Sequence, residues 1–139
     1  MYLLDTNVVS ELRKSRSRKA DAGVTRWADD VDVAELYLSV ISIQELEIGV
    51  RLAERRDPTQ GAMLRGWLND HVLPAFLGRV LAVDTAVALR AAALHVPDPR
   101  PVRDALIAAM ALVHGMTVVT RNVEDFQPTG VPTLNPWEA

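Results

Sequence analysis

Acidic side chains at four separated positions, Asp5, Glu45, Asp104 and Asp125, have the residue type and the placement to perform chemistry. Each stands where a predicted strand gives way to a loop or to the start of a helix. In an open α/β sheet, the carboxyl ends of the strands form the crevice where such folds bind ligands. Carboxylates gathered there favour a hard divalent cation, because such cations prefer oxygen ligands. The pattern therefore predicts metal-assisted phosphoester chemistry.

Each acid also has a local structural explanation. Asp5 could form an Asx turn that begins a helix, and Ser42 with Glu45 fits a capping box. Asp104 could complement the dipole of its own helix, and Asp125 could form a local cap. Whether the fold brings the four acids together decides between these local roles and a shared site. Carboxylates about 4 Å apart repel by roughly 4 kcal/mol per pair at an effective dielectric of 20, so a gathered set must take up protons or a cation.

Basic residues lie near two of the acids in sequence. Arg121, beside Thr120, is a candidate contact for a substrate phosphate. Arg103 adjoins Asp104 and could contact a phosphate or form a simple ion pair. A basic cluster follows the first predicted helix and could grip RNA phosphates or remain a solvated loop; it consists of Arg13, Lys14, Arg16, Arg18 and Lys19.

The elements that must position these residues alternate between strands and helices. Apolar runs predict strands over residues 2–4, 36–40, 80–83 and 116–120, with an edge strand near 133–134. Helical periodicity predicts helices over 8–13, 24–31, 42–56, 59–72, 85–95 and 103–114, and a short helix or turn over 122–126. Such alternation predicts an α/β fold with a mostly parallel sheet and helices on both faces.

Length and composition limit the class of protein. The 139 residues fit one domain, and 49% apolar with 24% charged residues is typical of a globular protein. No apolar run approaches the ~20 residues of a membrane helix. The chain has no cysteine and no visible secretory signal, so we expect a cytoplasmic protein. A net charge of −3 gives no global attraction to nucleic acid, so local cations or a metal must hold a polyanion.

Several longer segments carry a family resemblance. They read LLDTNVVSEL, SVISIQELEIGV, RDALIAAMALVHGMTVVTRNVEDF and VPTLNPW, and they cover both ends and the centre of the chain. With them the chain resembles the PIN-domain ribonucleases, specifically the VapC-type toxins of bacterial toxin–antitoxin pairs. The resemblance implies one PIN-like domain over residues 1–139, folded as a three-layer α/β/α sandwich with a mostly parallel central sheet.

The resemblance also implies a site and an activity. Asp5, Glu45, Asp104 and Asp125 match the family's acids, which would hold Mg²⁺ or Mn²⁺ and activate water to cut RNA. Further residues match polar motif positions and are expected to support the acids; they are Thr6, Asn7, Thr120 and Asn122.

Partners follow from the same resemblance. Family members are neutralised by a small antitoxin whose C-terminal segment lies in a groove and can push an arginine into the acidic site. Its other end commonly binds DNA, and such toxins often form homodimers. In this chain, Trp67, Leu68 and Val72 could exceed what one helix face can bury, and a groove there would accept a partner helix. Ordinary packing of these side chains in the core is the alternative.

Two other functions compete with the ribonuclease. The acidic pocket could act mainly as a binding module that grips an arginine of a DNA-binding partner, with little cleavage. A metal-dependent DNA nuclease is a weaker third option, because the contact to the 2′-hydroxyl that separates RNA from DNA is not readable from the four acids.

Overall fold

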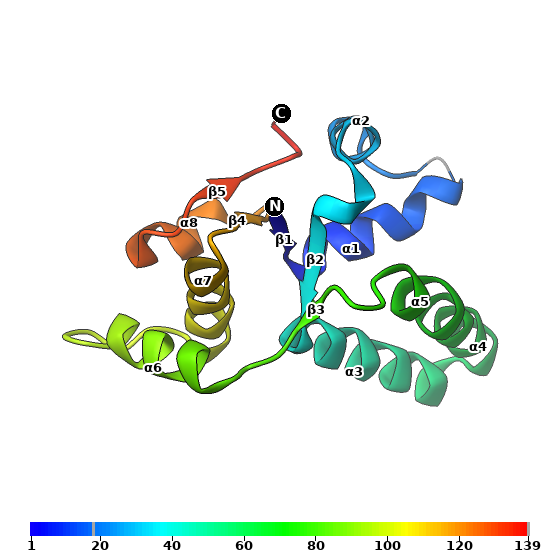
Figure 1. The fold of residues 1–139 in the computed structure, drawn as a ribbon. Helices are drawn as coiled ribbons and strands as arrows, with labels where there is room; N and C mark the ends of the chain where they lie inside the picture. The colour runs from blue at the N-terminus through cyan, green and yellow to red at the C-terminus, as the bar shows by residue number, and fades with distance from the viewer. Residues whose placement is uncertain (18, 139) are drawn as a thin grey trace.

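The computed structural model describes residues 1–17 and 19–138, and its centre is a five-stranded sheet (Figure 1). The strand order is β3-β2-β1-β4-β5, and each neighbouring pair is parallel. The strands are β1 (Tyr2–Leu4), β2 (Leu36–Ser39), β3 (Val80–Leu81), β4 (Thr117–Val119) and β5 (Thr133–Leu134). The predicted parallel sheet is therefore confirmed, although β3 is shorter than the strand expected over residues 80–83.

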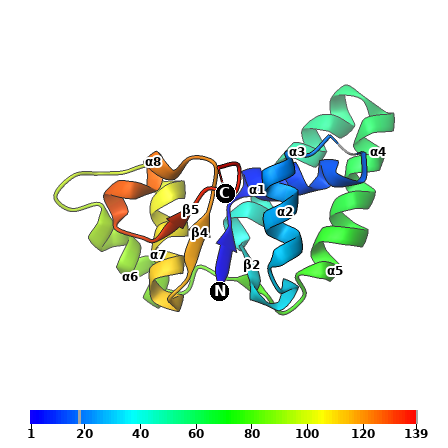
Figure 2. The same ribbon diagram turned by 90° about the horizontal axis from the view of Figure 1, so that it is seen from above.

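Helices cover both faces of the sheet (Figures 1 and 2). On one side lie α6 (Thr85–Leu94), α7 (Val102–His114) and α8 (Val123–Phe126), which leads into the 3₁₀ turn η4 (Gln127–Thr129). On the other side lie α1 (Thr6–Arg13), η1 (Lys14–Ser17), α2 (Ala22–Asp30), η2 (Val33–Glu35), α3 (Val40–Arg56), α4 (Pro58–Trp67), η3 (Leu68–Val72) and α5 (Leu73–Ala75). The expected three-layer sandwich is confirmed. In the part of the chain that the structure describes, no helix has the length and apolarity to cross a membrane.

The alternation of side chains along the central strands fills two separate cores. In β1, Leu3 packs with the helices on one face, whereas its neighbour Leu4 packs with those on the other. Val118 and Val119 of β4 divide in the same way. Successive residues of a strand point to opposite faces, so a short apolar run can be buried on both sides only in a covered, parallel sheet.

Helix starts differ from two sequence-based expectations. Ser39, at the end of β2, caps α3 by accepting a hydrogen bond of 3.0 Å from the backbone N–H of Ser42. The predicted capping box of Ser42 and Glu45 is therefore wrong, because Ser42 already lies inside the helix. Helix α4 begins at Pro58 and not at residue 59, and Asp57 caps it, since the extended backbone at Asp57 directs its carboxylate at the first turn.

The helix predicted over residues 59–72 is longer and less regular than expected. The helix continues from α4 through a π-helical turn, η3, into α5, so it passes Pro74 before it ends. Leu68 and Val72 of this π-helical turn are 1% and 5% exposed and belong to the core. The prediction that these two side chains line a groove for a partner is wrong.

Candidate functional site

The carboxyl ends of two neighbouring strands, β1 and β4, place a buried acid at the centre of the site. Asp5 follows β1 and is 1% exposed, and Thr120 follows the adjacent strand β4. The Thr120 hydroxyl donates to Asp5 Oδ2 at 2.8 Å, and the backbone N–H of Thr6 donates to Oδ1 at 2.7 Å. Asp5 thus begins α1 as a cap while its carboxylate stays fixed at the sheet edge.

Two helices, α3 and α7, bring further acids to the same edge. Helix α3 starts directly after β2 and carries Glu45, whose Oε1 accepts a hydrogen bond of 2.5 Å from the Thr6 hydroxyl. The Thr6 hydroxyl also lies 2.9 Å from the Ser42 hydroxyl, so α1 and α3 are joined through polar side chains. Asp104 occupies the first turn of α7, with its side chain 15% exposed.

The guanidinium of Arg103 joins these three acids. Its Nη2 donates to Asp5 Oδ1 at 2.5 Å and to Glu45 Oε1 at 2.8 Å. Its Nε donates to Glu45 Oε2 at 2.7 Å, and its Nη1 donates to Asp104 Oδ1 at 2.9 Å. Three of the four predicted acids therefore surround one cationic group, although they are far apart in sequence.

The contacts within this cluster shift the pKa of two side chains, Glu45 and Arg103. Partial burial acts to raise the pKa of Glu45, but the hydrogen bonds from Arg103 and Thr6 outweigh it, so the pKa lies below its usual value. Burial acts to lower the pKa of Arg103, yet the hydrogen bonds and charges of Glu45 and Asp5 raise it. Three carboxylates face one guanidinium, so the cluster remains negative and attracts further positive charge.

The remaining predicted residues lie around this cluster at different distances from it. Asp125 is exposed on α8, and within the described ranges its carboxylate makes no hydrogen bond or ion pair, so it stands outside the group joined by Arg103. Thr120 Oγ1 accepts hydrogen bonds from the backbone N–H of Asn122 at 3.0 Å and from the side chain of Asn7 at 3.5 Å. The backbone N–H of Arg121 donates to Asn7 Oδ1 at 3.4 Å.

An open cleft of about 430 Å³ lies beside the cluster, and the predicted residues that line it are Asp5, Thr6, Asn7, Arg103, Arg121 and Asn122. The Arg121 guanidinium lies 5.2 Å from the centre of the Trp137 ring, at the side of the cleft. Ser10 and Glu11 also line it and were not predicted. Both stand four residues after a predicted polar residue of α1, Thr6 or Asn7, so helical spacing was the signal that could have found them.

The donor atoms suit a hard divalent cation. Carboxylate and hydroxyl oxygens are the ligands that Mg²⁺ and Mn²⁺ prefer, and here they already converge on a cationic group. While the acids surround the guanidinium, however, the described residues contain no group of three or more His, Cys, Asp or Glu side chains that could hold a metal ion. The residues therefore fit a metal ion chemically, but not in the conformation in which Arg103 occupies the site.

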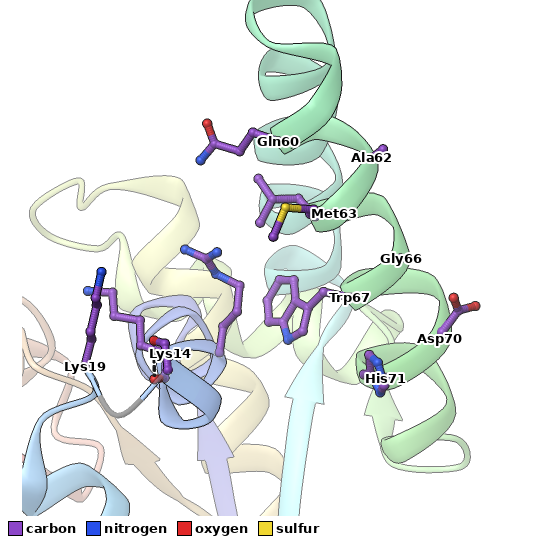
Figure 3. Close-up of a pocket in the computed structure, with 12 residues that line it drawn as sticks. Lys14, Lys19, Gln60, Ala62, Met63, Gly66, Trp67, Asp70 and His71 are labelled. Atoms are coloured by element: carbon purple, nitrogen blue, oxygen red, sulfur yellow. Dashed lines mark hydrogen bonds between the residues drawn. The ribbon is translucent and has the colours of Figure 1, made fainter.

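A second concave surface, which we call the α1–α4 groove, has a volume of about 690 Å³. Figure 3 shows Met63 and Trp67 projecting from α4 toward the segment that carries Lys14. The Arg13 guanidinium lies 5.9 Å from the centre of the Trp67 ring, and Met63 is 71% exposed. Of the predicted basic cluster, Arg13, Lys14 and Lys19 line this groove, whereas Arg18 lies outside the described residues.

Known proteins resemble this chain over nearly its whole length. The plasmid stability protein StbB of Pseudomonas syringae pv. tomato is 40% identical over 151 residues, covering 100% of both chains. VapC ribonuclease Y4jK of Sinorhizobium fredii is 36% identical over 143 residues, covering 99% of both.

Solved structures agree with the sequence comparison. FitAcB from Neisseria gonorrhoeae superposes with a TM-score of 0.90 at 33% identity, covering 100% of both chains. FitAB bound to the IR36 DNA fragment gives a TM-score of 0.89 at 33% identity, covering 99% of this chain and 96% of the other. The family profile of the PIN domain matches residues 2–129. The chain therefore belongs to the PIN-domain family.

Proposed function

We propose that this protein is a metal-dependent endoribonuclease and the toxin of a toxin–antitoxin pair. The observation that carries the proposal is the convergence of Asp5, Glu45 and Asp104 on Arg103 at the carboxyl edge of the sheet, beside an open cleft that Asp5 and Arg103 line. Carboxylates in this position suit a metal-assisted hydrolase better than a passive binding surface. The name of the relative Y4jK, a VapC ribonuclease, supports the same reaction class.

The acids would hold the metal ion. Asp5, Glu45 and Asp104 supply carboxylates from three different elements, and Asp125 is the fourth candidate, from α8. A bound Mg²⁺ or Mn²⁺ supplies a more acidic water and stabilises charge on phosphate oxygens. The chain's own part is to fix the acids: the Thr120 hydroxyl orients Asp5, and the Thr6 hydroxyl orients Glu45.

Cationic and polar groups beside the acids would hold the RNA. Arg121 lies at the edge of the cleft against Trp137, and Lys14 lines the same cleft from the end of α1. A guanidinium stacked on an aromatic ring keeps its N–H donors available at its edges, which suits a phosphate. A net charge of −3 makes such local contacts necessary, because the protein as a whole repels a polyanion.

The α1–α4 groove is our proposed site for the antitoxin. Exposed Met63 and the Trp67 ring offer an apolar surface, and Arg13, Lys14 and Lys19 add positive charge along it. An amphipathic segment with acidic residues would match both features. The structural relative FitAB, bound to a DNA fragment, supports a partner that also binds DNA.

Substitution of the buried acid tests the enzymatic proposal. Asp5→Asn keeps the shape of the side chain but removes its charge, and it should lower Mn²⁺-dependent cleavage of RNA by about a hundredfold or more. Loss of a residue that only supports a ligand typically costs 10–100-fold, so a direct ligand should exceed that range. Asp98→Asn is the matched control, because Asp98 is exposed and has no hydrogen bond or ion pair within residues 1–17 and 19–138.

The same pair of variants separates the competing functions in cells. Growth arrest by the wild type and by Asp98→Asn, but not by Asp5→Asn, is the expected result. Arrest that survives Asp5→Asn would instead favour a binding module. Purified Asp5→Asn that folds and still cuts RNA at the wild-type rate would contradict the assignment of the site.

A further inference from the structure

Among the described residues, Arg103 is the one side chain that touches all three clustered acids. It precedes Asp104 at the start of α7, and its guanidinium donates to Asp5, Glu45 and Asp104 at 2.5–2.9 Å. We propose that Arg103 is a built-in competitor of the metal ion, so that a divalent cation binds only after the guanidinium withdraws. This inference rests on the proposed metal-dependent function.

The competition follows from the oxygen atoms that Arg103 uses. Both carboxylate oxygens of Glu45 accept from it, one from Nε and the other from Nη2. Oδ1 of Asp5 accepts from Nη2, while Oδ2 is bound by the Thr120 hydroxyl. A metal ion coordinated by the same carboxylates would lie next to a guanidinium of like charge, so the two cations exclude each other.

The arrangement of the acids agrees with this exclusion. With the guanidinium in place, the described residues contain no group of three acids or histidines arranged to hold an ion. Arg103 stands between the carboxylates: Asp104 binds Nη1, whereas Asp5 and Glu45 share Nη2 and Glu45 also binds Nε. Its departure would let the carboxylates approach one ion.

Arg103 can leave the cluster without disturbing the core. Its side chain is 35% exposed and lines the open cleft. In the described residues its side-chain hydrogen bonds all go to the site itself, namely to the three acids and, at 3.4 Å, to Thr6 Oγ1. The flexible stem can therefore swing into the cleft while α7 stays in place.

A purely structural tie is the alternative role for this residue. If Arg103 only held α7 and α3 together, its removal would lower the stability of the fold and leave metal affinity unchanged or weaker. Competition predicts the opposite for metal affinity. If the guanidinium occupies the acids at least nine-tenths of the time, the apparent Kd of the ion is raised about tenfold or more.

Calorimetric titration of the full chain with Mn²⁺ provides the test. Arg103→Gln should bind Mn²⁺ about tenfold or more tightly than the wild type. Arg121→Gln is the matched control, because Arg121 lines the same cleft but contacts Trp137 instead of the acids. It removes the same charge, and we expect its Kd to change by no more than about threefold through the general field.

Thermal unfolding adds a readout that does not depend on cleavage. Without metal, Arg103→Gln should melt below the wild type, because the three carboxylates lose their counter-charge, and Mn²⁺ should raise its melting temperature more than that of the wild type. Should Arg103→Gln fail to fold, Arg103→Lys keeps the charge without the fork, and tighter binding than in the wild type is again expected.

The possible results separate the two proposals. Mn²⁺ uptake by the wild type with an equal or weaker affinity in Arg103→Gln, or in Arg103→Lys if that variant replaces it, overturns the competition and leaves the nuclease proposal standing. No Mn²⁺ uptake by the wild type or by either Arg103 variant overturns both.

Discussion

The hydrogen bond between Thr120 and Asp5 is the contact whose removal tests the site most directly. Both residues are buried, at 0% and 1% exposure, and the Thr120 hydroxyl donates to Asp5 Oδ2 at 2.8 Å. Thr120→Val replaces this hydroxyl with a methyl group of similar size. The variant therefore removes one donor to a buried carboxylate, together with the oxygen that accepts from the Asn122 backbone N–H and the Asn7 side chain, and leaves the volume of the core almost unchanged.

The expected loss of stability in Thr120→Val follows from the charge and burial of the acceptor, the Asp5 carboxylate. A hydrogen bond to a charged group contributes about 1.5–3 kcal/mol, and a buried oxygen left without its donor loses that contribution. We expect the free energy of unfolding to fall by about 2 kcal/mol. With a urea m-value of about 1–3 kcal/mol/M, the unfolding midpoint should move down by about 1 M.

Urea unfolding followed by circular dichroism measures this shift. Thr117→Val is the matched control, because Thr117 lies in β4 and, in the part of the chain that is described, its hydroxyl makes no hydrogen bond. It should unfold within about 0.5 kcal/mol of the wild type, as substitutions outside specific contacts do. If the Thr120→Val midpoint matches those of the wild type and Thr117→Val, the buried carboxylate does not depend on this donor and the reasoning fails.

Two further predictions concern the contact between α3 and α4. A Cβ at Gly61 would lie 2.4 Å from the Glu54 Cα, so Gly61→Ala should cost about 1–3 kcal/mol in chemical unfolding. A Cβ at Gly49 would meet nothing within 4 Å, so Gly49→Ala should raise the free energy of unfolding by up to about 1 kcal/mol. Equal changes in the free energy of unfolding for the two variants would refute the close approach of the helices at Gly61. Hydrogen bonds from Arg65 hold the pKa of Glu47 at about 2, against an ordinary 4.5. The contribution of the ionised Glu47 side chain to stability is then complete above pH 4.5 and disappears as the pH falls through about 2. Glu47→Gln should therefore have a lower melting temperature than the wild type near neutral pH and approach it in acid. A difference in melting temperature that stays constant with pH would contradict this.

Several features of the fold could be predicted because they depend on short-range patterns. The strand at residues 2–4 and the apolar helix that ends at Gly115 follow from local hydrophobic spacing and from a left-handed glycine with φ of 68°. The choice of cap at α3 was wrong because Ser39 and Ser42 both fit the local rules. The end of β2 selected Ser39, and that depends on pairing with strands distant in sequence.

The sequence by itself determined which acids were available and that parallel strands would bring some of them to one edge. Residue type and strand position suffice for that, since the carboxyl ends of parallel strands share a side of the sheet. Only the tertiary structure decided that Arg103 stands among Asp5, Glu45 and Asp104 while Asp125 remains exposed. The physical reason is that side-chain contacts between elements depend on helix orientation and rotamers, which the packing of the two cores fixes and no local pattern encodes.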